Sequence, residues 1–220
     1  MNKNPQLHAG PFSLWLRRMR TALVHETGMD VPCATCNACC RASYFIHIRS
    51  KEKETIRHIP KKILFPAPRS AQGDVLLGYN EHGHCPMLID NRCSVYGHRP
   101  ITCRTYDCRI FSAAGLSADD NDISMRSREI PQWRFSYPNP LDLRQHSAVK
   151  AAGRFLQQHG RELPDELVPA NAIQLALLSI KVYDVFMRFD IRRTDSSTRT
   201  GHIIRAVVKA HEKFAQRSRA

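Results

Sequence analysis

The chain lacks the features that identify many enzymes and membrane proteins. Its ten glycines form no G-x-G pair, so the sequence shows no glycine-rich loop for a dinucleotide or a similar cofactor. No run reaches the ~18 apolar residues of a membrane span. The apolar stretch from Phe12 to Leu16 ends at Arg17, too early for the core of a secretory signal peptide. We therefore expect a globular, cytoplasmic protein without a membrane span.

Acidic residues are also scarce compared with basic ones. The chain has 20 Asp and Glu against 33 Lys and Arg, which gives a formal net charge of +13 at pH 7. Such a charge favours anionic partners, nucleic acid among them. The basic residues are scattered, however, and no helix-turn-helix spacing or aromatic-interleaved RNA-binding motif is present. We expect no specific nucleic-acid partner, only weak binding that fades with salt, and we leave a protein partner open.

Cysteine is absent from the first 32 and the last 112 residues, and all eight cysteines lie between these segments. Four form a C-x2-C-x2-C-C knot and four follow after a gap: Cys33, Cys36, Cys39, Cys40, Cys85, Cys93, Cys103 and Cys108. Thiolates two residues apart can converge on one metal centre. Disulfides are the alternative, but a chain of 220 residues is long enough to bury a hydrophobic core without disulfide cross-links. We predict that all eight cysteines are metal ligands.

The spacing of the cysteines bears on which metal they bind. Zinc sites usually pair two short C-x2–4-C hooks, whereas the last four cysteines are separated by seven, nine and four residues. The C-x2-C-x2-C run is similar to the one that holds a 4Fe-4S cluster in ferredoxins. Thiolate ligands suit both metals. We favour an iron–sulfur cluster of the 4Fe-4S type and keep zinc as the alternative.

The residues around the cysteines resemble one family. Cys85-Pro86-Met87-Leu88 forms a Cys-Pro-x-Leu step, Cys93-Ser94-Val95-Tyr96 forms a Cys-Ser-x-Tyr step, and Arg99-Pro100 precedes Cys103-Arg104. With the knot, and with Cys108 as the closing cysteine, this pattern resembles the YkgJ-like CxxCxxCC cysteine-cluster family, known as a zinc- or iron-chelating domain. The resemblance spans about a third of the chain. It implies that the segment binds a metal or an iron–sulfur cluster.

The resemblance implies less about activity. One branch of the family is similar to the flagellin lysine N-methylases, so a protein lysine N-methyltransferase is an alternative to a cluster with a structural or electron-carrying role. The C-x3-C-x2-C knot of radical S-adenosylmethionine enzymes is absent, because the third position is Ser43. No catalytic residue can be assigned. The sequence therefore leaves open whether the protein is an enzyme.

Several side chains near the cysteines could tune a cluster. Arg99, Arg104 and Arg109 could offset thiolate charge and donate hydrogen bonds to sulfur, or could be ordinary surface arginines. Tyr96 could shield the cluster or simply pack in the core. His84, next to Cys85, is the best histidine ligand, although most histidines of a basic protein lie on its surface.

Hydrophobic periodicity predicts an α+β, mostly helical fold, in which a small irregular metal-nucleated cysteine domain is flanked by an N-terminal helix and a C-terminal helical layer. The predicted divisions are a tail and helix (1–30), a cysteine domain (31–111), an irregular linker (112–138) and a helical region (139–220). Within them, residues 1–10 are expected to be a loose tail. Helices are predicted over 11–28, 51–58, 139–160, 170–189 and 199–217, with a short one opening at Asp165, and strands over 44–48 and 75–79.

Overall fold

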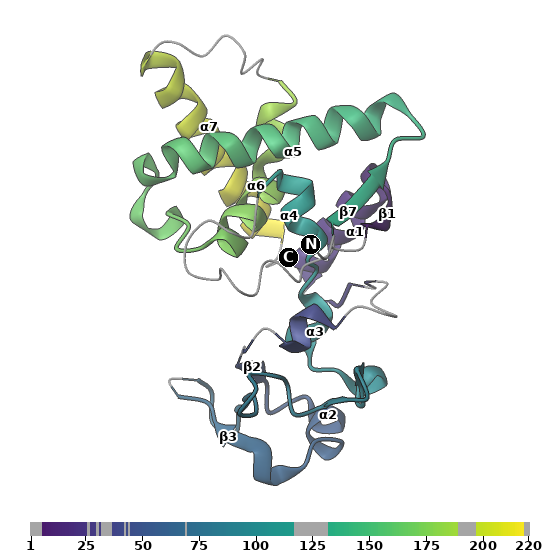
Figure 1. Cartoon of the computed structure of the whole chain (residues 1–220). Coiled ribbons are helices and arrows are strands. Elements are labelled where there is room, and N and C mark those ends of the chain that lie inside the picture. The colour runs from purple at the N-terminus through teal and green to yellow at the C-terminus, as the bar shows by residue number, and fades with distance from the viewer. Residues whose placement is uncertain are drawn as a thin grey trace. The chain divides into compact units, whose positions relative to one another are not determined.

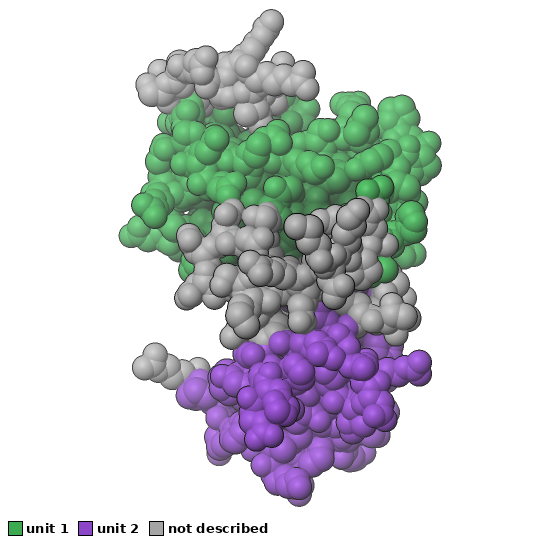
Figure 2. Space-filling model, viewed as in Figure 1, with its two compact units in different colours: residues 1–26, 108–128, 132–220 green, residues 27–107, 129–131 purple. Residues whose placement is uncertain are grey.

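The computed structural model describes residues 6–25, 27–29, 31, 37–41, 43, 45–68, 70–116, 132–188 and 197–217. The chain divides into two units (Figures 1 and 2). Unit 1 comprises residues 1–26, 108–128 and 132–220, and unit 2 comprises residues 27–107 and 129–131. The fold is α+β and mostly helical, as predicted. Among the helices in the described ranges, none has the length and apolar character needed to cross a membrane.

Unit 1 is built from helices and one pair of strands. Its helices are α1 (Phe12–His25), α4 (Arg109–Ala114), α5 (Pro140–His159), α6 (Ala172–Phe186) and α7 (Ser197–Arg217), with 3-10 turns at Gly160–Glu162 and Asp165–Leu167. Strands β1 (Gln6–Pro11) and β7 (Gln132–Ser136) pair in parallel. The helices predicted over 11–28, 139–160, 170–189 and 199–217 are confirmed, three of them with shorter ends.

Two expectations for unit 1 are wrong. The predicted loose tail contains β1, and the predicted irregular linker contains the end of α4 and the whole of β7; residues 117–131 of that linker lie outside the described part. Leu7 pairs with Trp133, and the register then shifts between His8 and Gly10. Gly10 has a φ of +83°, a conformation that glycine adopts without strain. The pairing stabilises β7, whose alternating pattern is only five residues long, and β1, in which the alternation is shorter still.

The core of unit 1 lies between α5, α6 and α7. Phe155 and Leu156 of α5 pack there with Val182 and Phe186 of α6 and with α7. Gly153 serves a close approach of α4 to α5, because a Cβ atom at that position would lie 2.5 Å from the carbonyl oxygen of Ala114. This apolar cluster contains no cysteine, so the folding of unit 1 has its own source of free energy.

A buried carboxylate joins the N-termini of α1 and α5. Asn139 and Asp142 form a capping box at the start of α5, and Asp142 Oδ1 also accepts a 2.7 Å hydrogen bond from the backbone N–H of Ser13 in α1. Although burial opposes ionisation, the hydrogen bonds from Ser13 and Asn139 lower the pKa of Asp142. The Asn-Pro start of this helix was predicted from sequence, whereas its link to α1 was not.

His146 is buried in unit 1 as a neutral imidazole. Its ring stacks on Phe12 with the centroids 4.2 Å apart, while Nδ1 lies 2.7 Å from Tyr137 Oη and Nε2 lies 3.2 Å from the carbonyl oxygen of Ser112. Burial, with a smaller contribution from the charge of Lys150, lowers the pKa of His146 to about 4. The fold therefore excludes a proton that the unfolded chain binds.

Acid is expected to destabilise unit 1 through His146. Because the folded pKa lies below that of an exposed histidine, the unfolded state binds the proton more readily, and stability is lost as the pH falls from about 6.5 to about 4. The melting temperature of the helix signal should fall by several degrees between about pH 7.5 and pH 5. The variant His146→Gln should melt lower at pH 7.5 but show a smaller drop, and an equal drop in both proteins would contradict the assignment.

Unit 2 consists of short elements. It contains α2 (Lys53–Arg57), α3 (Ile101–Thr105), a three-stranded antiparallel sheet of β2 (Ile46–Ile48), β4 (Val75–Leu77) and β3 (Leu64–Pro66), in that order, and a hairpin of β5 (Leu88–Ile89) and β6 (Arg92–Cys93). Its 3-10 turns lie at Ala38–Arg41, Lys61–Ile63 and Tyr96–His98. The strands predicted over 44–48 and 75–79 and the helix over 51–58 are confirmed as shorter elements; Tyr44 lies outside the described residues.

The hydrophobic core of unit 2 is small. Ile48, Leu77 and Val95 are among the five buried residues that form it, and Cys85 and Cys93 pack against it while only partly buried. A core of this size gives limited stabilisation. A bound metal would add the folding free energy that the apolar residues do not supply.

Candidate metal centre

Four cysteines from distant parts of the sequence meet in unit 2. Burial raises the pKa of Cys103 to about 12, and the charges of Cys85, Cys40 and Cys93, in that order, raise it further, so their sulfurs lie close enough to interact. All four side chains are partly buried, and each is a thiol rather than half of a disulfide. The structure therefore brings one cysteine of the knot together with three of the later cysteines.

Main-chain contacts hold Cys40 beside Cys85. The backbone N–H of Cys85 donates a 2.6 Å hydrogen bond to the carbonyl oxygen of Cys40. Burial raises the pKa of Cys85, the neighbouring Cys93 adds to this, and a hydrogen bond from the backbone N–H of Met87 opposes both. An N–H directed at sulfur favours the thiolate, which is the form that binds metal.

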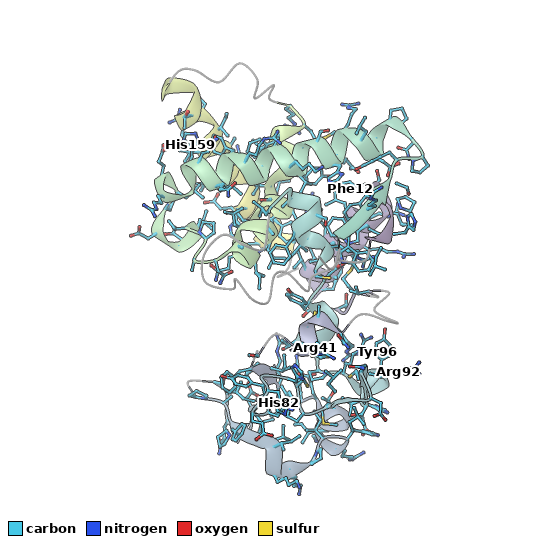
Figure 3. All side chains as sticks on the ribbon, viewed as in Figure 1. Phe12, Arg41, His82, Arg92, Tyr96 and His159 are labelled. Carbon is cyan, nitrogen blue, oxygen red and sulfur yellow. The ribbon has the colours of Figure 1, made fainter. Side chains whose placement is uncertain are left out.

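A polar clamp, formed by Asn37, Arg41 and Asn91, ties the knot to the β5–β6 hairpin. Arg41 is labelled in Figure 3. Its Nε donates to Asn37 Oδ1 at 3.0 Å, and its Nη2 donates to Asn91 Oδ1 at 2.5 Å. Asp90 and Asn91 form the hairpin turn with φ of +48° and +61°, the left-handed pair that a type I′ turn requires. This clamp joins Arg41, next to Cys40, to the turn that precedes Cys93. It was not predicted from the sequence, although an Asp-Asn pair is typical of turns.

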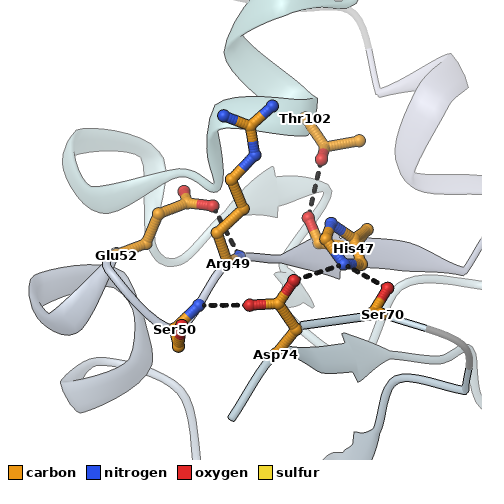
Figure 4. A network of polar contacts seen from close by, with 7 residues as sticks. All are labelled: His47, Arg49, Ser50, Glu52, Ser70, Asp74 and Thr102. Atoms are coloured by element: carbon orange, nitrogen blue, oxygen red, sulfur yellow. Dashed lines mark hydrogen bonds and ion pairs between the residues drawn. The ribbon is translucent and has the colours of Figure 1, made fainter. Parts of the chain in front are cut away.

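A buried glutamate positions the helix that carries Cys103. Glu52 Oε2 accepts a 2.6 Å hydrogen bond from the backbone N–H of Ile101 at the start of α3. Its Oε1 accepts a 2.9 Å hydrogen bond from the backbone N–H of Arg49. Thr102 Oγ1 donates to the carbonyl oxygen of His47 in β2 at 2.6 Å (Figure 4). A carboxylate at a helix N-terminus satisfies backbone N–H groups that lack helical partners. Glu52 and Thr102 thus anchor α3 to the sheet.

Replacing Glu52 with alanine is expected to loosen α3. The loss leaves two backbone N–H groups without their acceptor and should cost about 1–2 kcal/mol. Hydrogen exchange of peptides covering α3 should then be about tenfold faster or more. The control is Glu54→Ala, because Glu54 is an exposed carboxylate of the same region that pairs with exposed Arg57, and such pairs contribute little. Equal exchange in the two variants would refute the positioning role.

The polar contacts around His47 do not form a catalytic relay. His47 Nε2 lies 3.1 Å from Asp74 Oδ2 and also 3.1 Å from Ser70 Oγ (Figure 4). A Ser-His-Asp relay needs its serine and its carboxylate on opposite ring nitrogens, whereas here both contact the same one. Asp74 Oδ1 also accepts from the backbone N–H of Ser50 at 2.8 Å, the main contact that lowers the pKa of Asp74. The group is a structural tie between β2 and the segment before β4.

The other residues considered from sequence fall into different places. Arg99 lies near the thiols, since its charge lowers the pKa of Cys103 against the larger effect of burial, and its guanidinium stacks 3.6 Å from the centroid of the exposed Tyr96 ring. Arg104 is exposed, and Arg109 is buried in unit 1 beside Trp133. The backbone N–H of His84 donates to Asn80 Oδ1. Of the three arginines, Arg99 best matches the expected role of offsetting thiolate charge.

The remaining cysteines have other surroundings or lie outside the described residues. Cys39 is exposed on the 3-10 turn of the knot. Cys108 belongs to unit 1, where Trp133 Nε1 donates a 3.0 Å hydrogen bond to its Sγ. Cys33 and Cys36 lie outside the described residues. Within the described ranges, no three His, Cys, Asp or Glu side chains form a ready-made metal site. The chemistry of the donors nevertheless fits a thiophilic metal, because four half-buried thiols converge.

Comparison with known proteins agrees with the cysteine pattern. Residues 32–127 match the model of the CxxCxxCC family, whose description reads "Putative zinc- or iron-chelating domain". The match supports metal binding by this segment. Neither the curated proteins nor the solved structures gave a match.

Proposed function

Because residues 32–127 match the model of the CxxCxxCC family, we propose that the protein holds iron–sulfur of the 4Fe-4S type, four thiolates to a cluster, with ligands drawn from the eight cysteines between Cys33 and Cys108. The observation that carries this proposal is that Cys40, Cys85 and Cys93 lie near enough to Cys103 to raise its pKa, all four being partly buried thiols of unit 2. In the sequence, Cys33 and Cys36 precede Cys39 in the C-x2-C-x2-C run.

The surroundings of the four thiols suit a cationic centre. Buried thiols resist ionisation, and their mutual repulsion resists it further, so a thiolate set at this position needs a compensating positive charge. A metal centre supplies that charge when bound. Arg99 and the backbone N–H of Met87 act in the same direction on Cys103 and Cys85. Both groups stabilise thiolate sulfur in the way that tunes the potential of a cluster.

The cluster would serve a structural or an electron-carrying role. The structural role follows from the small core of unit 2, which a metal centre would complete. The electron-carrying role is favoured by partial exposure, because Cys40, Cys85 and Cys93 are only half-buried and a cluster held there would lie near the surface, within reach of a redox partner. A protein lysine N-methyltransferase activity gains no support from the described residues.

Spectroscopy of protein purified without oxygen tests the proposal. A 4Fe-4S cluster gives a brown protein whose visible absorption is bleached by dithionite, with an electron paramagnetic resonance signal in one oxidation state. Recovery of the absorption on reoxidation would indicate an electron carrier, and destruction of the cluster on reduction would indicate a structural role. A colourless protein that contains zinc would replace iron–sulfur by the zinc alternative.

A further inference from the structure

A basic groove in unit 1, remote in sequence from the cysteines, has no assigned role. It has a volume of about 420 Å³ and lies between α1, the start of α5, α6 and the end of α7. Its lining combines cationic with apolar side chains, namely Arg17, Arg20, His25 and Arg217 with Leu16, Val24, Leu141 and Phe214. None of the described residues that line it is acidic. This volume is in the range of about 300–1,000 Å³ that is typical of small-molecule sites.

One buried polar atom without a partner belongs to a residue that lines this groove. Among the described residues, Gln145 Oε1 is buried without a hydrogen bond, and Gln145 lines the groove, whereas the hydroxyl of neighbouring Ser13 contacts Asp142. Gln145 Nε2 lies 3.3 Å from Tyr183 Oη; if the amide were rotated, Tyr183 could donate to its oxygen and leave the NH2 group directed at the groove. A buried polar group without a partner is costly. The Gln145 amide therefore favours an occupant of the groove that forms hydrogen bonds.

Arg20 holds a positive charge at the inner wall of the groove. Its Nη1 donates to the carbonyl oxygens of Ile180 and Lys181 at 2.7 and 2.9 Å. Its guanidinium lies 5.0 Å from the ring centroid of Tyr183 and 4.9 Å from that of Phe214. Burial lowers the pKa of Arg20, with the charges of Tyr183 and Asp184 opposing this effect. In the described part of the chain no carboxylate forms an ion pair with Arg20, so the charge is held in place by carbonyl dipoles and aromatic faces.

We propose that this groove binds a small organic anion with an acidic group and an apolar body. The acidic group would face Arg17, Arg20 and Arg217, because guanidinium groups bind carboxylate, sulfonate and phosphate oxygens through paired hydrogen bonds. The apolar body would cover Leu141 and Val24, which line the groove and keep exposed surface, and would remove that surface from water. Every residue of the site belongs to unit 1, so the proposal stands independently of the metal in unit 2.

Two related fluorescent probes test this site on the full-length chain. The probe 8-anilino-1-naphthalenesulfonate is an aromatic anion, and N-phenyl-1-naphthylamine has the same aromatic skeleton without the sulfonate. We expect the anion to bind the unmodified protein more tightly. The double variant Arg17→Gln/Arg217→Gln changes two exposed side chains and should weaken binding of the anion about tenfold, or about 1.4 kcal/mol, while leaving the uncharged probe unaffected.

The matched control removes the same charge elsewhere in unit 1. Arg144 and Arg154 are exposed on α5 and do not line the groove, so Arg144→Gln/Arg154→Gln should leave both affinities unchanged. The variant Leu141→Glu adds a carboxylate to the lining. It should weaken binding of the anionic probe as strongly as the loss of the two arginines does. Equal affinity of the unmodified chain for both probes, or an equal loss in the control, would overturn the proposal. So would anion binding that ignores the groove variants, which would place the probe on the exposed Phe45, Phe65 and Tyr79 of unit 2.

Discussion

Replacement of Cys103 by serine is expected to remove most of the metal from the protein and to unfold much of unit 2. Cys103 lies where Cys85, Cys40 and Cys93 converge, and it sits on α3, which Glu52 and Thr102 fix to the sheet. Serine offers a harder oxygen that binds zinc and iron clusters poorly in place of thiolate. Where the core is small, metal-binding free energy contributes to folding free energy. The loss of folding stability should therefore exceed that caused by an ordinary core substitution.

The measurement is the metal content per chain, together with hydrogen exchange across residues 45–106. The control is Thr105→Val on the same helix, which removes a hydroxyl that hydrogen-bonds within α3 and takes no thiol away. It should keep its metal. If the serine variant is insoluble, Cys40→Ser tests the same cluster from the knot side. A soluble Cys103→Ser protein with its full metal content would show that Cys103 is not a ligand.

Removal of the metal with a chelator is expected to unfold unit 2 and to spare unit 1. Unit 1 has its own apolar cluster, to which α5, α6 and α7 contribute Phe155, Val182 and Val207, and a capped α5. Unit 2 has a small core against which two of the proposed ligands pack. Loss of the metal would remove the positive charge that stabilises these ligands as thiolates, together with the cross-links that the metal forms between them.

Circular dichroism and limited proteolysis can follow this separation. The far-ultraviolet helix signal should largely persist after chelation, because the long helices belong to unit 1. Proteolysis should become fast within residues 45–106 and stay slow within 140–186. The same chelator saturated with zinc beforehand provides the control, because it cannot take the metal from the protein. Complete loss of the helix signal would show that the two units fold as one.

The helices of unit 1 were predictable because their signals are local. Asn139-Pro140 marks the start of α5, and Asn139 forms a capping box with Asp142. Apolar residues recur at helical spacing along α6, from Ala172 to Phe186. The β1–β7 pair was not predictable. Its strands lie more than a hundred residues apart and pair in parallel. Polar and apolar residues alternate in β7, but five residues of alternation do not identify a partner strand, and the alternation in β1 is shorter still. Pairings of this kind are specified by the assembled fold and leave little trace in sequence.

The cysteine pattern predicted the metal-binding segment but not its assembly. Spacing could not show that Cys40, Cys85, Cys93 and Cys103 form one group, because that depends on the Asp90-Asn91 turn and on the Glu52 cap. The basic groove could not be predicted from the sequence either. Arg17, Arg20 and Arg217 come from opposite ends of the chain, and in sequence they were three of many scattered charges.

Native mass spectrometry of the full chain, purified and sprayed without exposure to oxygen, tests the central claim most directly. It weighs the intact protein together with whatever its cysteines hold. The account predicts a mass increment equal to four iron and four sulfur atoms per cluster, lost in the Cys103→Ser variant and retained in Thr105→Val. A chain that carries only zinc would contradict the iron–sulfur assignment, and a chain with no bound metal under these conditions would contradict the metal centre itself.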